Sequence, residues 1–170
     1  MATYNQAFDL YHTLYRFLHI ISRFEGGTIE IDRLRIWDYY LLFPGEVYDI
    51  KLKKEESEIR RLRMRFLKKN ANPYESVTNR RKVFERLRVY QYCALNCLVS
   101  YGIIDYTGLS QNRVIISNAE KFHRIMEIIN PLSDTENNVL SLLMFLSTTS
   151  LYGVDGIKDR TGLIESKYDA

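Results

Sequence analysis

Apolar side chains recur at helical spacing along much of the chain. Residues 4–24 carry them three or four positions apart, which places them on one face of a helix, and Gly26 and Gly27 end the run. Residues 33–43 form a second predicted helix that is apolar on nearly every side and stops at Pro44. A helix of that composition belongs in a core or in an interface. Its candidate core or interface side chains are Trp37, Tyr39, Tyr40 and Phe43.

In the predicted helix over residues 55–69, apolar and basic side chains separate onto opposite faces. The inward stripe consists of Ile59, Leu62 and Phe66. Because successive residues turn by about 100° around a helix axis, three basic side chains fall together on the opposite face. They are Arg61, Arg65 and Lys68. We expect this cationic stripe to contact a partner protein or DNA.

The longest predicted helix covers residues 79–101. Its apolar stripe faces inward, and its far side carries three further candidate contact residues. They are Arg81, Arg88 and Tyr92. The start of the helix offers only Asn79, Arg80 and Arg81 for reading bases, which favours non-specific phosphate contact over sequence readout.

Short β segments interrupt the helical pattern. Residues 28–31 alternate between apolar and polar, and residues 103–106 and 113–117 predict a hairpin around the turn-forming residues between them. Two Ser-x-x-Glu capping boxes, beginning at Ser117 and Ser133, predict the starts of two more helices. From residue 153 onward the chain is mostly polar.

This order predicts a mainly α fold with a small β-hairpin, arranged as a winged helix-turn-helix-like domain. The domain is expected over residues 1–152, with residues 44–78 as a basic insertion and residues 153–170 as a polar C-terminal tail. In such an arrangement the long helix or the turn before Arg113 would meet DNA, with Arg113 as the cation at the tip of the wing.

Composition agrees with one ordered domain. The chain has 170 residues, of which 46% are hydrophobic and 26% charged, enough to bury a core without disulfides. The net charge of +3 conceals an asymmetry, because residues 51–88 hold fourteen Lys and Arg against five Asp and Glu. Such a concentration attracts phosphate backbones and acidic protein surfaces alike. The alternative is that these cations form solvated helix faces.

Enzyme motifs do not occur in the sequence. It contains no phosphate-binding G-x-x-x-x-G-K-[ST], no H-E-x-x-H, no G-x-S-x-G and no pair of C-x-x-C knuckles. Cys93 and Cys97 stand one helical turn apart without further zinc ligands nearby, so packing is the better interpretation. Glu46 with Asp49-x-Lys51 resembles a nuclease signature, but these residues are too close together in sequence.

We therefore predict no catalytic residue, no cofactor or metal site and no small-molecule substrate. The N-terminus lacks a basic region followed by an apolar run, and no stretch reaches the length needed to span a bilayer. A soluble cytoplasmic protein without membrane contact is expected.

The run from Arg33 to Gly45, RLRIWDYYLLFPG, lies between a Tyr-rich helix and a basic helix. In this context it resembles the small middle components of bacterial ABC-three-component systems, which in turn resemble the accessory subunits of Lamassu-type defence operons. The resemblance implies a non-catalytic adaptor in an antiviral or anti-plasmid complex. Its expected partners are an SMC- or Rad50-like ATPase and an effector, often a nuclease, which it would bridge, with contact to the backbone of double-stranded DNA. The alternative is a stand-alone winged-helix transcriptional regulator.

Overall fold

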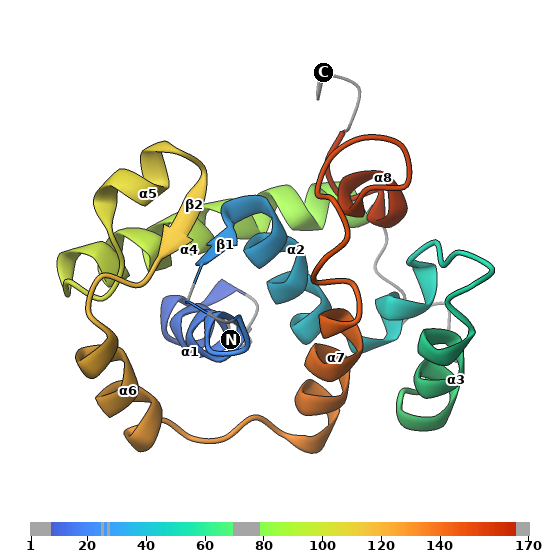
Figure 1. Cartoon of the computed structure of the whole chain (residues 1–170), viewed down its shortest axis with the longest axis horizontal. Coiled ribbons are helices and arrows are strands. Elements are labelled where there is room, and N and C mark those ends of the chain that lie inside the picture. Colours follow the sequence, from blue (N-terminus) through green and yellow to red (C-terminus); the bar gives the residue numbers. More distant parts are fainter. Residues whose placement is uncertain (1–7, 25, 27, 70–78, 166–170) are drawn as a thin grey trace, which may run out of the picture. The chain divides into compact units, whose positions relative to one another are not determined.

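The computed structural model describes residues 8–24, 26, 28–69 and 79–165. These residues are mainly helical and include one two-stranded antiparallel sheet (Figure 1). The chain divides into two compact units, each described separately below. Unit 1 comprises Met1–Asp38 and Arg86–Pro131, and unit 2 comprises Tyr39–Glu85 and Leu132–Ala170. The division falls inside two helices, α2 (Ile31–Leu42) and α4 (Arg80–Ser100).

Unit 1 combines helices with the sheet. Apart from its parts of α2 and α4, its elements are α1 (Leu10–Ile21), β1 (Thr28–Glu30), α5 (Tyr106–Ser110), β2 (Arg113–Ile115) and α6 (Ala119–Ile128). The predicted first helix is confirmed over Leu10–Ile21, and its N-cap is Asp9, whose carboxylate accepts the backbone N–H of His12 at 2.9 Å; residues 8–9 and 22–24 were predicted to be part of it and are not α-helical. Residues 4–7 of that prediction lie outside the described residues.

The sheet pairs β1 with β2, which lie side by side in Figure 1. Residues 28–30 form a strand as predicted. The predicted hairpin is confirmed in part: Ile104 bridges Ile116, and the N–H groups of Asp105 and Ser117 donate to the carbonyl oxygens of Ile115 and Ile103 at 2.8 and 2.9 Å, but the strand that pairs with β2 is β1. Tyr106–Ser110 is helical instead, since the Asp105 carboxylate caps this turn by accepting from the Gly108 N–H at 3.1 Å. Gly108 is needed here, because a Cβ would lie 2.9 Å from the carbonyl oxygen of Arg113. The winged-helix assignment stays a prediction.

Unit 1 buries a charged network that the apolar pattern of α2 did not indicate. Arg16 Nε of α1 lies 2.6 Å from Asp38 Oδ1 of α2, and both side chains are almost fully buried. Gln91 of α4 donates to Asp38 Oδ2 at 2.9 Å and accepts from Arg35 Nε at 2.9 Å. Three helices are thus joined by polar contacts inside the unit.

Unit 2 is helical in its described part. Besides its parts of α2 and α4, it contains η3 (Pro44–Asp49), α3 (Ser57–Phe66), α7 (Asp134–Met144) and α8 (Ile157–Thr161). Helix α7 contacts both α3 and η3. The capping box predicted at Ser133 is confirmed, with the Glu136 N–H donating to Ser133 Oγ and the Ser133 N–H to Glu136. The box predicted at Ser117 in unit 1 is wrong, because Asn118 caps α6.

The segment expected to be a polar tail contributes buried residues to unit 2. Among its described residues, 153–165, Ile157 and Leu163 are buried and α8 forms a short helix. Arg160 is also buried, where its guanidinium donates to the Lys51 carbonyl oxygen and to the Glu56 carboxylate. These contacts hold α8 against the residues that precede α3.

Candidate interaction surface

Helix α3 carries two of the three cations predicted to form a contact stripe, Arg61 and Arg65; the helix predicted over residues 55–69 spans only Ser57–Phe66, so Lys68 does not share its face. Glu58 in its first turn and Arg63 and Arg65 in its last turn match the helix dipole. Arg61 is exposed and pairs with Glu58 at 2.9 Å. The exposed Arg65 holds its guanidinium carbon 5.1 Å from the centre of the Phe66 ring. Lys68, just beyond the helix, is exposed as well.

Arg63 has a different, internal role in unit 2. Its guanidinium lies 4.6 Å from the Tyr48 ring centre and donates to the Tyr48 carbonyl oxygen at 3.2 Å. The Tyr48 hydroxyl in turn donates to the Leu67 carbonyl oxygen at 2.9 Å. Burial lowers the pKa of Arg63 from its ordinary value. Arg63 and Tyr48 therefore anchor α3 to η3 and orient the exposed side of the helix.

Part of the positive charge of residues 51–88 is neutralised within unit 2. At least four of its cations pair with acids from outside that window, at 2.8 to 3.8 Å. The pairs are Lys51–Asp159, Lys53–Asp155, Arg80–Glu46 and Arg81–Glu165. The candidate Arg81 also donates to the Gly162 carbonyl oxygen at 2.9 Å. Arg81 is thus a contact between α4 and the segment after α8.

Glu46, one of the acids in the nuclease-like pattern, is buried in a polar cluster. Arg80 Nε lies 2.8 Å from its Oε2, and Arg80 Nη2 donates to the Tyr40 hydroxyl at 3.2 Å. Burial raises the pKa of Tyr40 well above its usual value, so its hydroxyl stays protonated. Asp49, the other acid of that pattern, is exposed, whereas Glu46 is buried. Within the described ranges no group of three His, Cys, Asp or Glu could hold a metal ion.

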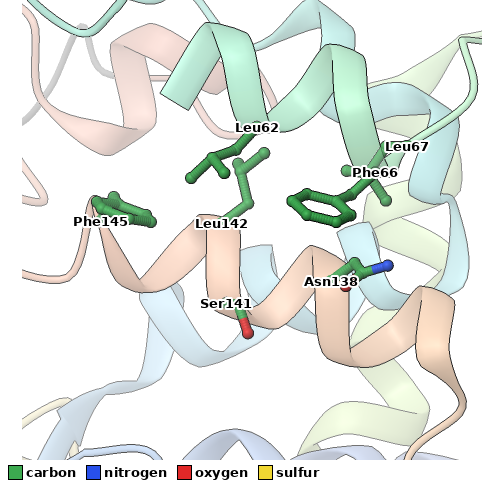
Figure 2. A pocket seen from close by; sticks show the side chains of 7 residues that line it. All are labelled: Leu62, Phe66, Leu67, Asn138, Ser141, Leu142 and Phe145. Atoms are coloured by element: carbon green, nitrogen blue, oxygen red, sulfur yellow. The ribbon is translucent and has the colours of Figure 1, made fainter. Parts of the chain in front are cut away.

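A shallow apolar hollow lies between α3 and α7 in unit 2 (Figure 2). Its lining comprises Leu62, Phe66, Leu67, Asn138, Ser141, Leu142 and Phe145, and its volume is about 90 Å³. Figure 2 shows the Phe145 and Phe66 rings on either side of Leu62 and Leu142. Phe66 is 47% exposed and Phe145 53% exposed. The predicted inward stripe of α3 is thus only partly buried, because Leu67 occupies the buried position next to Phe66.

The remaining candidate cations belong to unit 1. Arg88 is exposed and holds its guanidinium carbon 5.5 Å from the centre of the half-buried Tyr92 ring. Arg113 is an exposed residue of β2 and stands opposite Glu30 in the sheet register. The structure brings Arg88 and Tyr92 together, and it places Arg61, Arg65, Lys68 and Arg81 in the other unit.

Four aromatic residues were candidates for the core or an interface: three lie in α2 and one follows it. Each packs inside the unit to which it belongs. Trp37 is buried in unit 1, with its ring centre 5.0 Å from that of Phe24. Tyr39 and Tyr40 are buried in unit 2 with their rings edge to face. Phe43 is half-buried, 4.9 Å from Tyr39 between ring centres.

Sequence reasoning did not find the hollow. The hollow depends on how α3 packs against α7, and the residues that meet there lie about eighty positions apart in the sequence. The spacing of apolar residues describes each helix alone. A signal was present nonetheless. Phe145 follows Leu142 at helical spacing, so the stripe of α7 ends in an aromatic residue as the stripe of α3 does.

These observations define the class: a small α-rich protein whose candidate site is a cationic and apolar surface on a helix pair. A comparison with known protein families identifies the family. The chain matches the model of the ABC-three component (ABC-3C) system Middle Component 5 over residues 2–169, and it therefore belongs to that family. Searches of curated proteins and of solved structures gave no match. Among the helices of the described residues, none combines the length and apolar character that crossing a bilayer requires.

Proposed function

We propose that this middle component is a non-catalytic adaptor that joins an SMC-like ATPase to an effector nuclease in a defence complex. The family match over nearly the whole chain carries the proposal, because it makes the protein one component of a multi-component system. A component of that kind acts through the surfaces it presents to the others. A DNA-sensing role against phage or plasmid, in the cytoplasm, is part of the same proposal.

Unit 2 supports the adaptor role through two adjoining features of α3. The exposed cations Arg61, Arg65 and Lys68 are suited to acidic or phosphate-bearing partners. Beside them, Phe66 and Phe145 present apolar surface that a partner would cover. Exposed charge sets the rate and specificity of association, while buried apolar contacts supply most of the affinity.

The proposal is tested by producing the chain together with the ATPase and effector expected as its partners. We expect the three to co-purify through a tag on this chain. Reversing Arg61, Arg65 and Lys68 to Glu should weaken the assembly while leaving thermal unfolding unchanged, because all three side chains are exposed. Assembly that is unaffected by the reversal would show that the stripe is only a solvated face.

Contact with the backbone of double-stranded DNA is a second candidate function, favoured by the same exposed cations and by Arg88 beside Tyr92. We expect weak binding to random duplex that falls steeply with salt, and the triple reversal should reduce the magnitude of the log–log slope by up to about 2.7. A stand-alone regulator would instead prefer one operator by about a thousandfold or more.

A further inference from the structure

The hollow between α3 and α7 is flanked by two aromatic side chains that are each about half exposed. Phe66 comes from the end of α3, and Phe145 follows the last residue of α7. Both belong to the same lining as the deeper Leu62 and Leu142 (Figure 2). An aromatic side chain gains most when it is fully removed from water, so this arrangement leaves apolar surface available for a further contact.

The size of the hollow suits one aliphatic side chain. Its volume of about 90 Å³ is smaller than the roughly 150 Å³ of an apolar cavity that admits benzene. Its walls are helical except at Leu67 and Phe145, which follow α3 and α7. The Leu67 N–H donates to the Arg63 carbonyl oxygen and its own carbonyl accepts from the Tyr48 hydroxyl, while the Phe145 N–H donates to the Leu142 carbonyl oxygen, so the lining offers no free edge to which an extended segment could add as a strand. A helix laid along the α3–α7 groove, with one apolar side chain inserted, meets these constraints.

The charges at the rim define the chemistry of that helix. On the α3 side, Arg65 does not line the hollow, but its guanidinium carbon lies 5.1 Å from the ring centre of the lining residue Phe66. On the α7 side the lining polar residues are Asn138 and Ser141, which carry no charge. An acidic side chain placed beside the apolar anchor would pair with Arg65. DNA fits this site less well, because phosphate contacts need cations and gain nothing from an apolar hollow.

We propose that the α3–α7 groove docks an acidic amphipathic helix of another component of the same system. One apolar side chain of that helix enters the hollow between Leu62 and Leu142. An Asp or Glu about one turn away on the helix pairs with Arg65. This inference rests on the proposed adaptor function and names the chemistry of the partner segment.

The test uses this chain together with the other two components. Phe66→Glu and Phe145→Glu place a negative charge in the groove, and Arg65→Glu reverses the charge at its rim. Val154→Glu is the matched control, because Val154 belongs to the same unit, is 93% exposed and is not among the residues lining the hollow. Each groove variant should lose at least about 30-fold in affinity for the assembly, and the control should match the wild type.

A second measurement identifies the occupant without weakening the groove. Ser141 lines the hollow and is exposed, so we would replace it by an amino acid that carries a small aliphatic diazirine, whose side chain is close to leucine in size, and irradiate the assembled complex. We expect a cross-link to a partner segment that is rich in Asp and Glu and has helical apolar spacing. Excess random duplex DNA should not reduce the yield of this cross-link.

Different results would refute the groove proposal and the adaptor function. A complex that forms equally well with both Phe variants would overturn the groove proposal and leave the adaptor function standing. A cross-link to a second copy of this chain, to DNA or to a segment without acids would overturn it as well. If the wild-type chain forms no complex with either component, the adaptor function itself is refuted.

Discussion

Replacing Asp38 by asparagine removes one negative charge from the interior of unit 1 with almost no change in shape. The Asp38 side chain is 0% exposed and that of Arg16, 2.6 Å away, is 4% exposed. Asparagine leaves the Arg16 guanidinium without its buried counter-ion. Arg16 and Gln91 both donate to the Asp38 carboxylate. Because asparagine has an amide N–H₂ group in place of one carboxylate oxygen, one of these two donors would face another donor.

The expected loss of stability is large. Breaking a buried ion pair by removing one partner costs about 3–5 kcal/mol, out of a total of about 5–15 kcal/mol for a folded domain. For a chain of this length that corresponds to a fall in Tm of about 6–20 °C. Because the Coulombic gain of a buried pair is offset by desolvation, replacing both Arg16 and Asp38 by apolar residues should restore part of the loss.

Urea unfolding followed by tryptophan fluorescence is the appropriate assay. Trp37 is the only tryptophan of the chain and is buried in the same unit as Asp38. Glu58→Gln serves as the control, because it breaks the exposed Arg61–Glu58 pair, whose contribution should be close to zero. An Asp38→Asn protein that loses less than about 1 kcal/mol would refute the view that this network stabilises unit 1.

Two further predictions concern the core and the response to acid. Trp37→Ala should destabilise unit 1 by about 3–5 kcal/mol, measured by circular dichroism in urea, because the indole is buried against Phe24; a loss below about 1 kcal/mol would contradict this packing. Burial alone would raise the pKa of Glu56, but the hydrogen bonds from Arg160 and the Lys53 N–H outweigh it and hold this pKa below its ordinary value of 4.5. The carboxylate therefore contributes stability that is present above pH 4.5 and is lost as the pH falls through the lowered pKa of the folded state. Glu56→Gln should flatten the fall in Tm below pH 4.5, and a pH profile identical to that of the wild type would contradict the role assigned to this pair.

Local signals predicted the helices well because each helix carries its own evidence. The stripe of α4 and the break before Pro44 depend only on neighbouring residues, and the capping box at Ser133 satisfies its own backbone groups. The hairpin was predicted only in part, because the main pairing of β2 is not local: it pairs with β1, about eighty-five residues earlier in the chain, while the contact with residues 103–105 is limited to one bridge and two backbone hydrogen bonds before α5 begins at Tyr106.

The candidate site was predicted only in part for the same reason. The three cations were recognised from one predicted helix, and the structure places all of them at the surface, Arg61 and Arg65 on α3 and Lys68 just beyond it. The internal roles of Arg63 and Arg81 depend on Tyr48 and on residues after α8, which helical periodicity does not connect to them. Charge counting likewise overstated the exposed positive charge, because acids distant in sequence pair with several cations of residues 51–88.

The proposed adaptor function requires this middle component to assemble with the other components of its system. Native mass spectrometry of the three co-produced proteins tests it most directly. We predict one dominant complex that contains this 20.2 kDa chain with both the ATPase and the effector in a fixed ratio. A spectrum in which the chain occurs only as a free 20.2 kDa monomer or as a dimer of itself, beside the two unassociated components, would refute the adaptor function.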